Sequence, residues 1–142
     1  MSQTADDAAS GRQVAGKLGL RSGQVVQELG YDEDCDDPLR TSVEQVTGSP
    51  LVDEDHEDVV DAVLLWWRED DGDLVDALVD SLVSLGDGGV VWLLTPKAGR
   101  DGHVEPGDIG DAAPTAGLHQ TSSISAAADW SGTRLVTRRS GR

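Results

Sequence analysis

The sequence predicts a three-layer α/β fold whose sheet is mainly parallel and ends in an antiparallel pair of C-terminal strands. Three features lead to this prediction: two compact apolar runs, an amphipathic segment between them, and two strand-like segments near the end of the chain. Short apolar runs are typical of parallel strands that are buried on both faces. Their alternation with helices favours a layered fold in which these strands pair side by side.

In the first half of the chain, residues 24–29 are predicted as a short strand. Asp37 and Pro38 then start a helix, because aspartate caps the free N–H groups of a first turn and proline is tolerated there. Apolar side chains recur at helical spacing up to Gly48, which ends the helix. Residues 51–52 are predicted as a second, very short strand.

The second half of the chain carries the clearest periodic signals. One apolar run reads VVDAVLLWW and the other GGVVWLLTP. Between them, LVDALVDSLVSL places leucines on one stripe of a helix and aspartates on the opposite side. The predicted elements are a strand over 59–67, a helix over 74–85, a strand over 88–96, a short helix over 108–116, and strands over 119–128 and 132–137.

Length and composition place these elements in one domain. A chain of 142 residues is expected to form a single core. We place this core at residues 13–137, between a disordered N-terminal tail (1–12) and a basic C-terminal tail (138–142). No run approaches the ~20 apolar residues that a membrane span needs, and the N-terminus lacks the pattern of a signal peptide. The sequence therefore predicts a cytoplasmic protein without membrane contact.

The formal net charge of -16 is concentrated in the first two thirds of the chain. Residues 1–94 hold 22 acidic and 5 basic side chains, whereas residues 95–142 hold 5 and 6. Nucleic-acid binding depends on lysine and arginine side chains that neutralise phosphates, so direct binding of nucleic acid is not expected. An acidic surface favours a protein partner with a basic surface.

Several segments resemble one family of proteins. DAVLLWW, DLVDALVDSL, GGVVWLLTPKAGR, GLHQTSS and DWSGTRLV follow one another as in an actinobacterial family of unknown function, and the resemblance runs from about Val14 to Val136. That family looks like a shortened relative of the methyltransferases. The resemblance implies a Rossmann-like, methyltransferase-like fold, and it implies a link to redox-responsive control of transcription, which is associated with some relatives.

The resemblance also implies where a cofactor would bind. Methyltransferase-like folds hold adenosyl-methionine on a glycine-rich turn after the first strand, with an acid at the end of the second strand for the ribose. Here the turn has one glycine, Gly30, and residues 32–37 hold five acids. The missing glycines prevent a close backbone approach, and the acids repel the phosphates of a dinucleotide. Asp53 or Glu54 could stand in for the ribose-binding acid, but we expect no cofactor.

The common catalytic and metal-binding patterns are incomplete in this chain. His56 starts a stretch similar to the zinc-protease pattern, but Val60 stands where the second histidine belongs. His103 and Glu105 resemble the H-x-E of zinc deaminases, without the Cys-x-x-Cys that follows it there. Cys35, the only cysteine, lies among aspartates that oppose formation of its thiolate. No metal site is predicted, and a thiol sensor at Cys35 is a separate hypothesis.

The glycine-rich segment TPKAGRDGHVEP carries Lys97, Arg100 and His103 directly after a predicted strand. Open α/β sheets place their ligand crevices at the carboxyl ends of strands, so these side chains are candidates for binding a ligand or a partner. A second interpretation is structural. In that case Lys97 and Arg100 pair with acids of residues 32–37 and 69–71, at up to about 1 kcal/mol for each exposed pair.

The four tryptophans divide into two groups. Trp66, Trp67 and Trp92 lie in buried-strand patterns and are predicted to pack in the core, with the adjacent Trp66 and Trp67 on opposite faces of the sheet. Trp130 lies in a predicted turn before Arg134, where an exposed ring would serve as an anchor for a partner.

Together these observations favour a non-catalytic regulatory or adaptor protein that binds a basic protein partner, for example part of the transcription machinery. A redox or stress response is the setting that the family resemblance implies. The alternative is a small-molecule-binding or catalytic methyltransferase-like protein that uses a crevice beside residues 95–106. The candidate contact residues are Lys97, Arg100, His103, Trp130 and Arg134.

Overall fold

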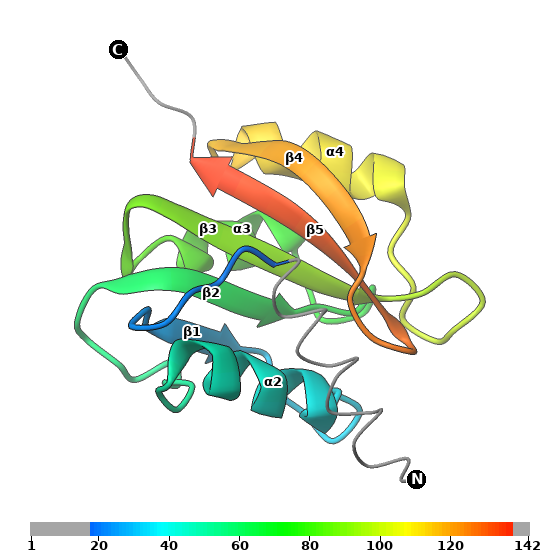
Figure 1. Ribbon diagram of the computed structural model, residues 1–142. Coiled ribbons are helices and arrows are strands. Elements are labelled where there is room, and N and C mark those ends of the chain that lie inside the picture. Colours follow the sequence, from blue (N-terminus) through cyan, green and yellow to red (C-terminus); the bar gives the residue numbers. More distant parts are fainter. Residues whose placement is uncertain (1–17, 138–142) are drawn as a thin grey trace, which may run out of the picture.

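The computed structural model describes residues 18–137 and contains a five-stranded sheet with helices on both faces (Figure 1). The strands lie in the order β1-β2-β3-β5-β4. β1, β2 and β3 pair in parallel, and β5 pairs antiparallel with β3 and β4. The elements are β1 (Val26–Leu29), α2 (Asp37–Thr47), β2 (Val60–Trp66), α3 (Leu74–Ser81), β3 (Leu85–Pro96), α4 (Pro106–Thr115), β4 (Leu118–Ser125) and β5 (Trp130–Thr137).

The predicted α/β fold with a C-terminal antiparallel pair is therefore confirmed. In Figure 1, α2 covers one face of the sheet, and α3 and α4 lie on the opposite face. Within the residues that the structure describes, no helix is both long and apolar enough to cross a membrane. The two tails predicted at residues 1–12 and 138–142 fall outside the described part of the chain.

α2 packs beside β1 and β2. Its cap is Asp36, one residue before the predicted Asp37, and the Asp36 carboxylate accepts the N–H of Leu39 at 2.9 Å. Gly48, at φ 81°, ends the helix and donates its N–H back to the last turn. The helix buries Leu39 and Val43 against the sheet, and burial of such side chains contributes about 1.5–3 kcal/mol each.

The core lies on both faces of β2 and β3. Trp66 and Trp92 pack in the cluster beneath α2, whereas Trp67 packs in the cluster beneath α3 and α4. The adjacent indoles of Trp66 and Trp67 therefore lie on opposite faces, as predicted from the period of a strand. All three side chains are buried, which confirms their prediction as core residues.

The largest boundary difference lies between α3 and β3. α3 ends at Ser81 and β3 begins at Leu85, so the helix is shorter and the strand longer than predicted. The reason is that Leu85 pairs with Val60 of β2 and so belongs to the sheet. The strand predicted at 51–52 is reduced to a single bridge, in which Val52 pairs with Gln27 at the outer side of β1.

Candidate functional site

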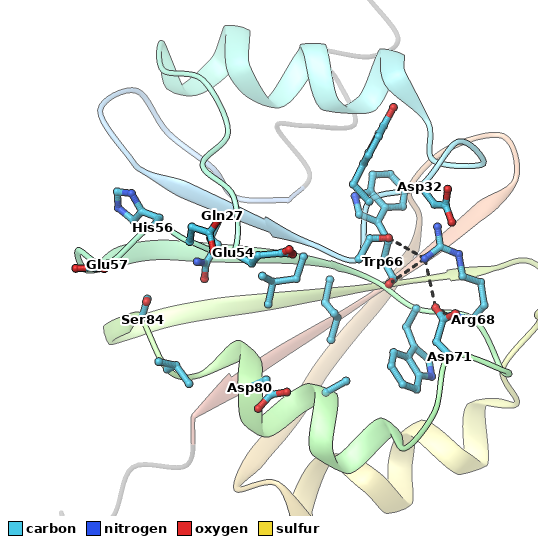
Figure 2. A pocket seen from close by; sticks show the side chains of 18 residues that line it. Gln27, Asp32, Glu54, His56, Glu57, Trp66, Arg68, Asp71, Asp80 and Ser84 are labelled. Carbon is cyan, nitrogen blue, oxygen red and sulfur yellow. Dashed lines mark hydrogen bonds and ion pairs between the residues drawn. The ribbon is translucent and has the colours of Figure 1, made fainter.

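A cavity of about 990 Å³ lies over β1 and β2, on the face of the sheet that carries α3 (Figure 2). Its floor is formed by the two strands. Residues 54–57 form one wall, α3 contributes to the opposite wall, and the turn after β1 (residues 30–32) closes one end. This end lies at the carboxyl ends of parallel strands, where α/β sheets commonly bind ligands.

The lining of this cavity is acidic. It contains one guanidinium, from Arg68, and six carboxylates, from Asp32, Glu54, Asp55, Glu57, Asp71 and Asp80. A concave site lined by one sign of charge attracts ligands of the opposite sign, so the cavity favours a cation and disfavours a phosphate. Among residues 18–137, no group of three or more histidine, cysteine, aspartate or glutamate side chains is placed to hold a metal ion.

Arg68 follows β2 directly, and its side chain reaches the turn after β1. Nη1 donates to the carbonyl oxygens of Gly30, at 2.8 Å, and Trp66, at 3.3 Å. Nε donates to one carboxylate oxygen of Asp34 at 3.0 Å, and Nη2 donates to the other. The guanidinium also lies 5.2 Å from the ring centroid of Trp130. This bidentate geometry is typical of arginine, and it holds the turn after β1 against the end of β2.

The Arg68 contacts change the protonation behaviour of their neighbours. The hydrogen bond from Arg68 holds the pKa of Asp34 below its ordinary value. Burial raises the pKa of the Cys35 thiol and outweighs the nearby cation. The sequence predicted this direction for Cys35 from the surrounding aspartates, but the charge of Asp34 is only a minor cause. Burial of the Arg68 guanidinium lowers its pKa, but the hydrogen bonds and charges of its acidic neighbours, chiefly Asp34, together outweigh burial, and the pKa is raised.

Several N–H groups of the turn after β1 are used within the turn itself. The N–H of Asp32 donates to Cys35 Sγ at 3.3 Å, and the N–H of Glu33 donates to the Asp32 carboxylate at 2.8 Å. Gly30, at φ 79°, lies against β2, because an added Cβ would stand 2.3 Å from the carbonyl oxygen of Trp66. A methionine carboxylate needs free donors and is repelled by nearby acids. With the N–H groups of Asp32 and Glu33 occupied and acids at 32–34, the turn does not fit that end of adenosyl-methionine.

The rest of the cavity is open and has two polar groups in notable positions. Two acids could stand in for the ribose-binding acid of related folds. Asp53 accepts the N–H of Asp55 at 3.0 Å and so orders its own loop, whereas Glu54 lines the cavity. Gln27 in the floor is only 4% exposed, and its Nε2 donates to the carbonyl oxygen of Asp53 at 3.0 Å.

A second ion pair lies on the α2 face of the sheet, behind the turn. Glu28 is 9% exposed and accepts hydrogen bonds from Arg40 Nε at 2.6 Å, Arg40 Nη2 at 2.9 Å and Trp66 Nε1 at 2.8 Å. The Arg40 guanidinium also lies 4.2 Å from the ring centroid of Tyr31, and its hydrogen bond to Glu28 raises its pKa. Both charges have internal partners, so we assign them a structural role.

The segment over residues 95–106 contributes no side chain to this cavity. Lys97 Nζ donates to the hydroxyl of Ser125 at 2.6 Å, and Arg100 pairs with Asp129 at 3.1 Å. The predicted ion pairs of Lys97 and Arg100 with the acidic runs are therefore wrong, although the charge of Arg100 does help to lower the pKa of an acid in the first run. The base that pairs with both acidic runs is Arg68.

Two further candidates make local contacts. His103 is half-buried, with Nδ1 2.9 Å from the carbonyl oxygen of Pro96 and Nε2 3.6 Å from the Glu105 carboxylate. Arg134 lies in β5 and donates from Nη1 to the hydroxyl of Thr121 in β4 at 3.0 Å. These positions leave both side chains at the surface, away from the cavity.

The expectation that Trp130 is exposed is wrong. Its side chain is 3% exposed, and its Nε1 donates to the carbonyl oxygen of Asp34 at 3.1 Å. Its ring meets that of Trp66 edge to face, with 4.9 Å between centroids. The physical reason is that β5 begins at Trp130, so the residue belongs to the sheet rather than to a turn. It packs against the turn after β1 and cannot anchor a partner.

Sequence reasoning missed two residues of the site, Arg68 and Gln27. Arg68 stands between two tryptophans and an acidic run, where the sequence alone favours a turn. The available signal was its position directly after a buried strand, at the carboxyl edge of the sheet. Gln27 occupies an inward position between Val25 and Leu29, where an apolar residue is the rule.

Comparison with known proteins gives the chain its family. The model for a protein of unknown function, DUF3052, matches residues 15–139. The uncharacterized protein Rv2239c of Mycobacterium tuberculosis (strain H37Rv) is 52% identical over 126 residues, which cover 89% of this chain and 79% of that protein. An uncharacterized protein of Mycobacterium bovis matches with the same identity and coverage.

Solved structures with a similar fold include methyltransferases. A TehB-like SAM-dependent methyltransferase from Corynebacterium glutamicum superposes with a TM-score of 0.54 and 14% identity over 90% of this chain and 88% of that one. Magnesium protoporphyrin IX methyltransferase from Synechocystis PCC 6803, solved with bound SAM, gives 0.57 and 12% over 92% and 79%. Identities this low establish the methyltransferase-like, Rossmann-like fold alone. Since the family match spans residues 15–139 of the 142-residue chain, the chain belongs to the DUF3052 family of proteins of unknown function.

Proposed function

We propose that this domain is a non-catalytic regulatory or adaptor protein that acts through contact with a protein partner. The observation that carries the proposal is the position of Arg68. Its guanidinium bonds to Gly30 and Asp34 across the turn on which a methyltransferase-like fold holds its cofactor. A fold does not by itself imply the activity of its structural relatives. Here side chains of the protein itself close the turn at which a methyltransferase would hold the methionine end of adenosyl-methionine.

The proposed partner has a basic surface, because the formal net charge of this chain is -16 and complementary charge steers and orients association. We take part of the transcription machinery as the partner class, a redox or stress response as its setting, and the cytoplasm as its location. Lys97, Arg100, His103 and Arg134 remain proposed contacts at the surface. Trp130 is withdrawn from this set because it is buried.

Two measurements test this proposal. Calorimetric titration of the purified protein with adenosyl-methionine is expected to give no binding at micromolar concentrations, and micromolar affinity would contradict the proposal. Affinity capture from the native organism, followed by identification of the partner, is expected to yield a complex that can be rebuilt from two purified proteins. If no captured protein binds directly, the adaptor role is wrong.

A second candidate function, binding or conversion of a small molecule, is favoured by one observation. The cavity has a volume of about 990 Å³ and presents Glu54 at the place where a ribose-binding acid is expected. This volume lies at the upper end of the range for small-molecule sites. Thermal-shift screening of nucleosides and cationic metabolites tests this candidate. A ligand that raises Tm in the unchanged protein, but not in Glu54→Gln, supports it, and the absence of any such shift contradicts it.

A further inference from the structure

The cavity is a groove with two acidic walls and an apolar floor, and we call it the acidic groove. Figure 2 shows Glu54, Glu57 and Gln27 on one side and Asp80 on the other. The floor between these walls includes the side chains of Leu65 and other apolar residues of β1 and β2. A ligand that fits this lining has positive charges on both flanks and an apolar strip in the middle.

Gln27 adds a hydrogen-bonding group to the lining of the groove. The residue is only 4% exposed, and its Nε2 donates to the carbonyl oxygen of Asp53. Among the described residues, no fully buried side-chain oxygen or nitrogen lacks a hydrogen-bond partner. The Oε1 atom, which has no partner in the described chain, is therefore accessible to solvent. It is available to accept a hydrogen bond from a ligand in the groove.

The α3 side of the groove carries an exposed apolar side chain. Val83 lines the groove and is 82% exposed. Val79 of α3 and Val59, which precedes β2, are also exposed, at 48% and 69%, but they do not line the groove. An exposed apolar side chain at a polar-rimmed hollow is typical of surfaces that bind another protein. A small inorganic or polyamine cation would leave Val83 uncovered.

We propose that the acidic groove binds an amphipathic basic segment of a partner protein. The apolar side chains of this segment lie on the floor and against Val83. Its lysine or arginine side chains pair with the walls, which contain Glu54, Asp55 and Glu57 on one side and Asp80 on the other. An N–H group of the segment donates to Gln27 Oε1. This inference rests on the proposed function as a protein-binding domain and adds the site and the chemistry of the partner segment.

The test uses a fluorescent synthetic peptide with leucines at helical spacing and lysines flanking them, titrated with the full chain in an anisotropy assay. The groove variant is Glu54→Gln/Asp55→Asn/Glu57→Gln. The matched control, Asp101→Asn/Asp108→Asn/Asp111→Asn, removes the same charge from residues that do not line the groove. We expect the groove variant to bind about tenfold more weakly, because each surface pair contributes roughly a factor of two to five. The control should bind as the unchanged protein does.

A second variant examines the apolar contact. Val83→Ser keeps every charge, and because Val83 is exposed this change should leave the fold intact. We expect it to weaken peptide binding about threefold, the effect of removing part of one apolar contact. Equal weakening by the groove and control triple variants would overturn the proposal, since it would reduce the effect to net charge. Spermidine that competes as well as the peptide, with no effect of Val83→Ser, would identify a small-cation site instead and also overturn it.

Two further measurements are needed. One distinguishes a partner segment from the chain's own tail as the occupant of the groove, and the other distinguishes failure of the groove proposal from failure of the adaptor function. If a chain ending at Thr137 binds the peptide more than tenfold better than the full chain, the occupant of the groove is the chain's own tail and the proposal is overturned. Suppose that an identified partner binds the groove variant normally but fails to bind Lys97→Ala/Arg100→Ala. In that case the groove proposal is wrong, while the adaptor function stands. Micromolar affinity for adenosyl-methionine would contradict the adaptor function, whereas the groove proposal would still be decided by the peptide measurements.

Discussion

Replacing Arg68 by methionine tests whether this side chain holds the turn after β1 in place. Methionine keeps the apolar stem but removes the bonds to Asp34 and to the Gly30 carbonyl oxygen, and the contact with Trp130. The Arg68 side chain is only 12% exposed, so its bond to the carbonyl is worth about 1.5 kcal/mol. The Asp34 pair is discounted to about 1 kcal/mol because Asp34 is 55% exposed. With the cation–π contact at about 0.5 kcal/mol, the expected loss is about 3 kcal/mol.

The loss can be measured by urea denaturation followed through tryptophan fluorescence. All four tryptophans are buried, so their emission reports on unfolding of the whole domain. The matched control is Arg134→Met, which removes one bond to an exposed hydroxyl and should cost about 0.5 kcal/mol. Arg68→Lys should fall between the two, because an ammonium keeps the charge but not the two-pronged geometry. A loss below about 1 kcal/mol in Arg68→Met would refute the assignment of this residue as the clamp of the turn.

Three other predictions concern the same turn. Gly30→Ala should cost about 3 kcal/mol or more, because a Cβ would meet the carbonyl oxygen of Trp66; Gly23→Ala, also at positive φ but with open space, should cost only about 1 kcal/mol in the same urea assay. Asp34→Asn should be destabilising at pH 7. Folding lowers the pKa of Asp34. The stability that its ion pair contributes is therefore fully present above the pKa that Asp34 has in the unfolded protein, and it is lost as pH falls through the pKa in the folded protein. The free energies of unfolding of the variant and the unchanged protein, plotted against pH, should therefore converge below about pH 4. A constant difference between them would contradict the ion pair. Cys35 should react with a maleimide at pH 7 more slowly than in urea-unfolded protein, because burial raises its pKa; equal rates would contradict this.

The layers of the fold could be predicted from the sequence because they depend on local patterns. The run around Val63 and Leu64 is apolar at successive positions, and only a strand buried on both faces explains such a run. The helix boundary at Ser81 could not be predicted in the same way. The helical spacing of leucines continues past Ser81. Continuation of the helix competes with the pairing of Leu85 with β2, and this pairing arises only once the sheet has formed.

The candidate site was harder to predict because its contacts join distant parts of the chain. Arg68 and Asp34 are 34 residues apart, and parallel pairing of β1 with β2 brings them to the same edge of the sheet. Trp130 reaches the same turn from 96 residues away. From the sequence alone, the acidic run after Gly30 is expected to be exposed to solvent. In the folded domain this run is held by one guanidinium and one indole, which is why the expected partners of Lys97 proved wrong.

The closed turn raises the question of whether removing Arg68 would restore a cofactor site. We expect that it would not. Arg68→Ala removes the guanidinium, but the N–H groups of Asp32 and Glu33 still donate to Cys35 and to the Asp32 carboxylate. The exposed acids of the turn would then lack their cation, and they would repel a methionine carboxylate more strongly than before.

Calorimetric titration of Arg68→Ala with adenosyl-methionine is therefore expected to give no heat of binding at micromolar concentrations, in protein shown by circular dichroism to be folded. The unchanged protein serves as the comparison. Binding by the variant alone would mean that Arg68 is a removable plug over an intact site, and a regulatory role for the protein would then include release of that plug. Failure to bind means that the turn differs from a cofactor turn in its backbone hydrogen bonds and its charge, so that no single side chain accounts for the difference.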